Sequence, residues 1–187
     1  MGKGLSILFL IMLLPYGPSH ASNTSSASRE FRTANDLFAS DRFQDALSLY
    51  QKLLASPPRG VTVNDIYTRI GDSYFRLGSF DSALDAYRSA LKHQKESGQP
   101  ETRYWIGLCC FLLGRNADAV NEFLIIPERY PSSGMWVGTA YYWAGRASER
   151  MGKTEAAAQY YRKAGGNGRS TQGKFALEKA KAVKNPE

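Results

Sequence analysis

The chain has 187 residues, of which 43% are hydrophobic and 22% charged, and its formal net charge is +7. This length suits one globular unit or one short repeat array, and a charge of this size with both signs present argues against a disordered acidic or polybasic chain. Two cysteines cannot build the disulfide framework of a small secreted scaffold.

The N-terminus has the three-part pattern of a secretory signal peptide. Lys3 gives a positive start, Leu5 to Leu14 form an apolar run, and Ser19-His20-Ala21 places small residues three and one before a cut. The run is about ten residues, half of what a spanning helix needs, so an uncleaved membrane anchor is the weaker alternative. We therefore expect residues 1–21 to be a signal peptide and the protein to be exported, and thus periplasmic or secreted.

A short polar segment follows the expected signal peptide. Residues 22–28 are nearly all Ser, Thr, Asn or Ala, a composition typical of flexible segments. We expect this segment to be a flexible leader in front of the first helix.

The body of the chain repeats itself with a period of about 37 residues. In each unit an alanine is followed four positions later by an aromatic residue, and in three units a glycine precedes the alanine by twelve positions. Small residues midway along two antiparallel helices let the backbones approach closely, and the ring fills the gap between neighbouring hairpins. The alanine and aromatic pairs are Ala46 and Tyr50, Ala83 and Tyr87, Ala119 and Phe123, and Ala157 and Tyr161; the small residues before them are Ala34, Gly71, Gly107 and Gly145.

This period predicts an all-α protein, a right-handed α-solenoid of about four helical hairpins. Gly78, Gly114 and Gly152 are expected to end first helices, and Asp81 and Thr154 are the expected N-caps of second helices. We expect the array over residues 29–166, with units near 27–60, 64–98, 100–132 and 138–168, and a basic capping helix over 170–184.

The order of small residue, glycine turn, alanine, aromatic residue and closing proline resembles the tetratricopeptide repeat, over about Ala27 to Ala164. Three segments within it are similar to the repeats of a Tol-Pal-associated periplasmic coordinator of envelope constriction: Tyr104-Trp105-Ile106-Gly107, Tyr142-Trp143-Ala144-Gly145 and Tyr130-Pro131-Ser132-Ser133. β-barrel assembly lipoproteins and soluble lytic transglycosylases have similar repeats. The resemblance implies a scaffold that binds proteins within a bacterial envelope complex.

The sequence departs from each of these families. We expect no coiled coil before the repeats, as the coordinator has, and no cysteine after the apolar run for lipid attachment. We also expect no catalytic domain of the transglycosylase kind. Only the scaffold is therefore expected to carry over.

The residue types do not support catalysis, so we expect no enzyme activity. His93, the only histidine outside the expected signal peptide, lies among lysines as a solvated residue would. Cys109 and Cys110 diverge by about 100° on a helix, so we expect packing residues, with an intermolecular disulfide as the alternative. Gly168 to Lys174 has the spacing of a phosphate-binding loop, but Phe175 stands where Ser or Thr is needed. We expect no cofactor, nucleotide or metal.

The inner face of stacked hairpins is lined by their first helices and forms a concave groove that suits an extended or helical peptide. Three consecutive units repeat an aromatic residue at the same inward position. For any single ring, packing between units is an equally good interpretation. The predicted groove residues are Phe31, Asn35, Phe38, Thr68, Asp72, Phe75, Tyr104, Leu108, Phe111, Tyr142, Arg146 and Glu149.

The end of the chain is basic, with a net charge of +5 after Tyr161. The alternative function is therefore an accessory that binds peptidoglycan or a cell-wall hydrolase through this end, in contact with an anionic surface. A solvated terminal cap of the array is the simpler interpretation. Export argues against a nucleic acid partner, and the pattern that binds a C-terminal carboxylate in chaperone-binding relatives is not matched.

Overall fold

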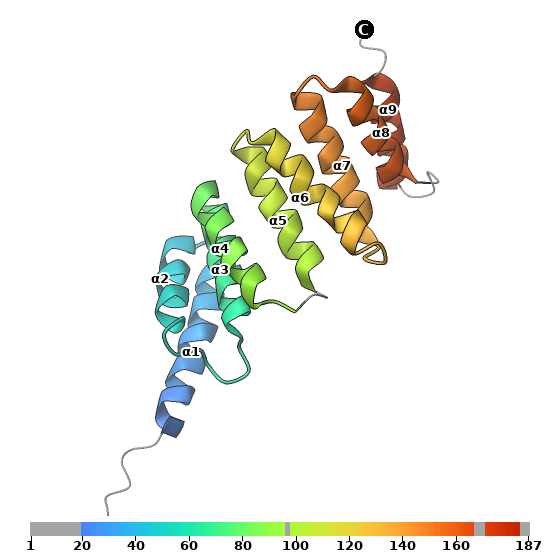
Figure 1. The fold of residues 1–187 in the computed structure, drawn as a ribbon. Coiled ribbons are helices and arrows are strands. Elements are labelled where there is room, and N and C mark those ends of the chain that lie inside the picture. Colours follow the sequence, from blue (N-terminus) through green and yellow to red (C-terminus); the bar gives the residue numbers. More distant parts are fainter. Residues whose placement is uncertain (1–19, 96–97, 167–170, 184–187) are drawn as a thin grey trace, which may run out of the picture.

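The structure, a computed structural model, describes residues 20–95, 98–166 and 171–183, and every regular element in these ranges is an α-helix (Figure 1). The helices form four consecutive hairpins and a final single helix, which confirms the predicted all-α solenoid with its capping helix. In chain order they are α1 (His20–Ala39), α2 (Phe43–Leu53), α3 (Val63–Arg76), α4 (Phe80–His93), α5 (Gln99–Leu112), α6 (Asn116–Arg129), α7 (Met135–Arg150), α8 (Thr154–Gly165) and α9 (Thr171–Ala182).

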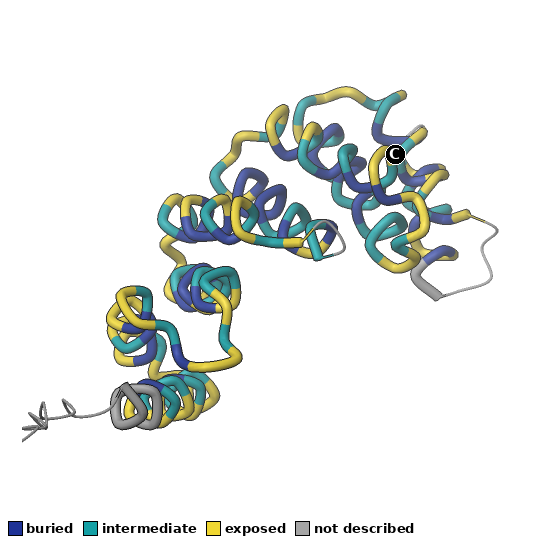
Figure 2. The backbone as a smooth tube through the Cα atoms, turned by 60° about the horizontal axis from the view of Figure 1, so that its bottom comes forward, coloured by how far each residue is buried: buried dark blue, intermediate teal, exposed yellow. Residues whose placement is uncertain are grey.

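The hairpins stack in chain order into an elongated, curved array (Figure 2). Consecutive helices pack against one another, and α5 also packs against α7. The core therefore runs along the array instead of lying at one centre, and its largest cluster joins α4, α5, α6 and α7. None of the described helices is long and apolar enough to cross a membrane.

The last helix closes the array. α9 packs against α8 and buries Ala176 and Ala180. The capping helix expected over 170–184 is thus described over Thr171–Ala182. The segment with phosphate-loop spacing, Gly168 to Lys174, lies partly outside the described residues.

Each hairpin turns at one residue in the left-handed conformation. The backbone angle φ is 59° at Asp41 and 71° to 74° at Gly78, Gly114 and Gly152. The N–H of the following residue then donates to the carbonyl oxygen five residues earlier, which closes the first helix in a Schellman motif. A Cβ makes this conformation costly, so glycine occupies three of the four positions. The predicted ends of the first helices at the three glycines are confirmed.

The predicted N-caps of the second helices are wrong. Ser79 and Lys153 occupy the cap positions of α4 and α8, and neither side chain makes a cap hydrogen bond. Their ψ angles, 69° and 68°, lie outside the extended conformation that aims a cap side chain at the helix, because the hairpin turn is so tight. Asp81 and Thr154 instead lie within the first turn of their helices.

The expected flexible leader is also wrong, because residues 22–28 belong to α1. Ala27 is buried in the core cluster of the first hairpin, so this polar segment has one apolar contact that its composition does not reveal. The expected signal peptide lies outside the described residues except for His20 and Ala21, which begin α1.

One contact sets the helix spacing in three of the hairpins. A Cβ placed on Gly71, Gly107 or Gly145 would lie 2.6 to 2.8 Å from a ring carbon of the aromatic residue on the second helix. Those three rings, Tyr87, Phe123 and Tyr161, are fully buried. The predicted close approach of the two helices at the small residue is thus confirmed. The ring, which was expected in the gap between neighbouring hairpins, lies against the glycine inside its own hairpin.

We expect Gly107→Ala to lower the free energy of unfolding by about 1 to 2 kcal/mol, because the overpacking of Phe123 outweighs the gain in helix propensity. Gly138→Ala is the matched control: its Cβ would meet only the Ala164 carbonyl oxygen, at 3.8 Å. That variant should be neutral or slightly more stable in urea denaturation followed by circular dichroism. Equal stability of the two variants would contradict the proposed spacing contact.

Candidate functional site

A hollow of about 520 Å³ lies on the face lined by the first helices of the first three hairpins. α1, α3 and α5 enclose it together with the loop before α3 and Gln94 after α4. Its volume falls within the range of pockets that bind small ligands or short peptide segments. We call it the concave hollow; Phe31, Asn64, Thr68, Asp72, Glu101 and Trp105 are among its lining residues.

Three predicted groove residues meet in this hollow. Phe31 comes from α1, and Thr68 and Asp72 lie one helical turn apart on α3. All three are half-buried, so each keeps part of its surface open. This part of the predicted groove is therefore a real cavity.

The repeated inward phenylalanines are packing residues, and the predicted groove is wrong at these positions. Phe38 and Phe75 pack edge to face against the first residue of their own second helix, with ring centroids 5.2 and 5.4 Å apart. Phe111 is only 2% exposed and Leu108 only 7%. Phe75 and Phe111 also contact Trp105 and Trp143 of the next hairpin, so these rings pack both within and between hairpins.

Two tryptophans, which the predicted groove omitted, continue this packing between hairpins. Trp105 lies 5.3 Å from Phe75 and 6.2 Å from Tyr87 between ring centroids. Trp143 makes the equivalent contacts with Phe111 and Phe123, at 5.2 and 6.5 Å. Each tryptophan thus closes the inner side of one interface.

The equivalent position at the first interface holds Arg69. Arg69 lies two residues before Gly71, as Trp105 lies two residues before Gly107. Arg69 lines the concave hollow, as does Trp105 from the opposite wall. The stack of rings is therefore interrupted on the side where the hollow lies. The sequence shows this interruption as an arginine at a position where the next two units have tryptophan.

Two of the polar groove residues, Asn35 and Asp72, accept hydrogen bonds from buried tyrosines. The hydroxyl of Tyr50 donates to Asn35 at 2.7 Å, and that of Tyr87 donates to Asp72 at 2.8 Å. The third unit has Phe123 and Leu108 at the same two positions, so it has neither donor nor acceptor. In the fourth unit Tyr161 donates to Glu149 at 2.6 Å.

Burial keeps these hydroxyls protonated. Burial raises the pKa of Tyr50 to about 12 and raises the pKa of Tyr87 and of Tyr161 as well. They therefore act as hydrogen-bond donors throughout the physiological pH range.

The charges of the concave hollow are mainly negative. Asp65, Asp72 and Glu101 line it against one cation, Arg69. Arg69 Nη1 lies 3.7 Å from Asp72 Oδ2, which is longer than a hydrogen bond. Burial raises the pKa of Asp72, and the Tyr87 hydrogen bond and the Arg69 charge oppose this rise. The hollow thus presents carboxylates with incomplete charge compensation.

The remaining predicted groove residues lie away from the hollow. Tyr104 packs against Trp105 and Trp136, with ring centroids 5.2 and 5.4 Å apart. Tyr142 contacts Phe175 of α9 at 6.0 Å, and Arg146 Nη1 donates to the Tyr142 hydroxyl at 3.5 Å. The predicted groove is therefore not one continuous site.

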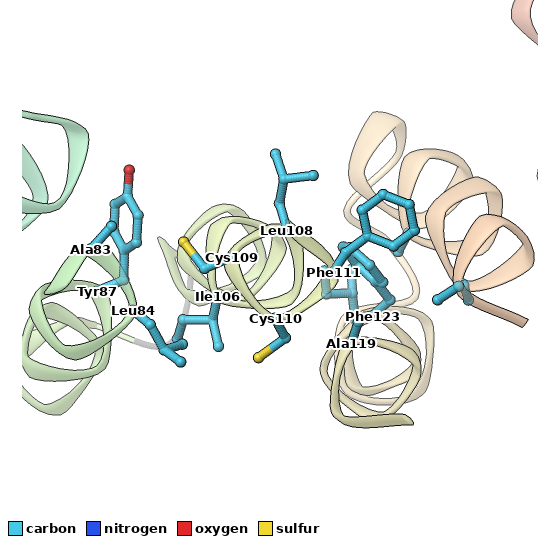
Figure 3. Close-up of a cluster of buried hydrophobic side chains, with 14 residues drawn as sticks. Ala83, Leu84, Tyr87, Ile106, Leu108, Cys109, Cys110, Phe111, Ala119 and Phe123 are labelled. Carbon is cyan, nitrogen blue, oxygen red and sulfur yellow. The ribbon is translucent and has the colours of Figure 1, made fainter. Parts of the chain in front are cut away.

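The cysteines are packing residues, as expected. Both thiols are buried and free, and burial raises the pKa of Cys109 to about 12 and that of Cys110 as well. Figure 3 shows the two side chains leaving α5 in different directions. Because neither thiol is exposed, the alternative of an intermolecular disulfide has no accessible sulfur.

The next features are the single histidine of the repeat array and possible metal ligands. His93 is exposed, and its ring stacks on Tyr67 with centroids 6.0 Å apart. Within the described ranges, no three His, Cys, Asp or Glu side chains are grouped so that they could hold a metal ion.

The basic C-terminal helix is partly neutralised by ion pairs. Lys179 Nζ lies 3.7 Å from a carboxylate oxygen of Glu149 on α7, and Lys181 Nζ lies 3.0 Å from one of Glu178. These pairs reduce the positive charge that α9 offers to an anionic surface. They favour its role as a structural cap.

We expect Tyr87→Phe to lower the free energy of unfolding by about 1 to 3 kcal/mol, because it leaves the Asp72 carboxylate half-buried without its donor. Adding Asp72→Leu should recover part of this loss, because the pair then matches Phe123 and Leu108 of the third unit. Urea denaturation of the two variants tests this. A double variant less stable than Tyr87→Phe alone would contradict the pairing.

Family models of the tetratricopeptide repeat match residues 68–133 and 138–164. Among curated proteins, human protein O-mannosyl-transferase TMTC2 is 25% identical over 115 residues, which are 62% of this chain and 14% of that protein. The chain therefore spans only a small part of that relative.

Solved structures of MamA have a similar fold. A crystal structure of MamA aligns with a TM-score of 0.60 over 81% of this chain and 94% of that chain, at 17% identity. MamA from Desulfovibrio magneticus RS-1 aligns with a TM-score of 0.63 over 84% and 93%, at 16% identity. At these identities the likeness concerns the fold alone, and the finer resemblance to the Tol-Pal coordinator and the β-barrel assembly lipoproteins stays a prediction. The chain contains tetratricopeptide repeats in residues 68–133 and 138–164.

Proposed function

We propose that this protein is a non-enzymatic scaffold that binds a peptide segment of a partner protein on the inner face of its array. The observation that supports this most is the concave hollow, which three successive first helices form together. Stacked repeats present extended concave surfaces of this kind, and peptides are bound there by rings that provide buried area and polar groups that fix register.

The hollow has the composition of such a site. Phe31 and Trp105 provide apolar surface at two of its walls, and Thr68 and Asp72 provide polar groups between them. Phe31 also packs on Tyr50 and Trp105 on Phe75, but both rings are only half-buried. The hollow is therefore a place where partly exposed inner-face rings and polar groups lie together.

We further propose that the protein is exported and acts in a bacterial envelope complex. The support is the pattern of the first 21 residues, with its positive start, apolar run and small residues before the expected cut. Cleavage after Ala21 would leave α1 beginning at Ser22, and Ala27 and Ala34 would still be buried in the first hairpin.

The proposed binding face can be tested with p-benzoylphenylalanine, a photo-crosslinking amino acid, in place of Thr68 in the source organism. The control replaces Ser89, which lines a separate hollow of about 330 Å³ between α2, α3 and α4 on the outer side. We expect a defined adduct from position 68 and none from position 89. Adducts from position 89 alone would contradict the proposal.

Export predicts activity of an alkaline phosphatase fused to the C-terminus, because that enzyme needs the disulfides of an oxidising compartment. Intact mass measurement of the purified protein should place its first residue at Ser22. Deleting residues 5–14 should abolish both results. An active fusion without these residues, or a cytoplasmic wild-type chain, would contradict export.

A further inference from the structure

We propose that the concave hollow binds a basic side chain, arginine or lysine, from an extended segment of the partner. This inference rests on the proposed function and adds the chemistry of the ligand. Three observations lead to it: the charge of the hollow, the geometry of its carboxylates and its rings.

Charge comes first. The lining includes Asp65, Asp72 and Glu101 but only one cation, Arg69. In a partly enclosed hollow, uncompensated carboxylates attract a cation and repel an anion such as a peptide carboxylate. A basic side chain thus fits, and an acidic segment or a free C-terminus does not.

Two of the carboxylates, those of Asp72 and Asp65, are oriented by hydrogen bonds to one oxygen each. Asp72 accepts the Tyr87 hydrogen bond through Oδ1, and Oδ2 has only Arg69 at 3.7 Å. Asp65 uses Oδ2 to accept hydrogen bonds from the backbone N–H and the hydroxyl of Thr62. Each carboxyl group is therefore oriented by the fold through one oxygen, and the other can receive a donor from a ligand.

The rings favour a cation as well. Phe31 and Trp105 line the hollow together with these carboxylates. The same protein already places guanidinium groups on rings, with Arg150 3.6 Å from the centroid of Phe111 and Arg146 5.8 Å from that of Trp143. A ligand cation beside Trp105 would make the same kind of contact.

The chain itself offers a matched variant. In the first unit Asn35 stands at the register of Asp72 and accepts the Tyr50 hydroxyl at 2.7 Å. Asp72→Asn should therefore keep the Tyr87 hydrogen bond and remove only the charge. The control is Asp85→Asn, which makes the same charge change in the outer hollow.

The test selects binders from a phage library of random dodecapeptides against the full chain. A selected peptide is then synthesised with blocked termini, both as selected and with citrulline or acetyl-lysine in place of its basic residue. Affinities for the wild type, Asp72→Asn and Asp85→Asn are measured by fluorescence anisotropy, with circular dichroism to check folding. A fourth variant, Thr68→Arg, tests whether the peptides bind in the hollow.

We expect the peptides to share a basic residue and to lose about tenfold in affinity when it is neutralised. Asp72→Asn should cause a similar loss of affinity, and this variant should bind the selected and the neutralised peptide equally well. Asp85→Asn should change the affinity by less than about twofold. Peptides that lose affinity for Thr68→Arg but show no preference for a basic residue would overturn this inference and leave the proposed function standing. A library without any binder, or binders unaffected by Thr68→Arg, would overturn both.

Discussion

The structure depends on one packing constraint, the contact of an aromatic ring with a residue that has almost no side chain. In three hairpins the ring lies where any Cβ on the facing glycine would clash, so the two helices are held at one separation. This fixes the second helix against the first, with edge carbons of the ring facing the glycine. Tyr87 and Phe123 then stack on Trp105 and Trp143, so the same rings that build a hairpin also join it to its neighbour.

The candidate site follows from where this arrangement changes. At the second and third interfaces a tryptophan fills the inner side, and at the first interface the position belongs to Arg69. The Arg69 side chain is 46% exposed and lies 3.7 Å from Asp72 as a loose ion pair, so no ring fills the inner side of this interface. The inner face is therefore apolar and packed along the later hairpins, and hollow, polar and acidic near the first ones.

The fold could be predicted from the sequence because its determinants are local and periodic. Small residues, rings and glycine turns recur at fixed offsets, and each reports a contact within one hairpin. The errors concern features that the repeated pattern does not mark. The leader was misjudged because burial of Ala27 depends on the first hairpin, and the caps at Asp81 and Thr154 because the tight turn fixes the backbone before them.

The site was only partly predictable for a related reason. Counting inward positions places Phe31, Thr68 and Asp72 on the inner face, where they line the hollow. The same count cannot tell a ring that faces solvent from one that faces the next helix. Phe111 and Leu108 were therefore assigned to a surface although they are core residues. The informative signal was the exception at Arg69, which is visible only when the units are compared position by position.

The most direct test of this account is a crystal structure of the protein with a bound peptide segment of its partner. The account predicts that the segment lies along α1, α3 and α5, in contact with Phe31, Thr68 and Trp105, with a basic side chain near Asp72. A segment bound on the outer hollow beside Ser89, or against Tyr142 and Phe175 at the far end of the array, would contradict it.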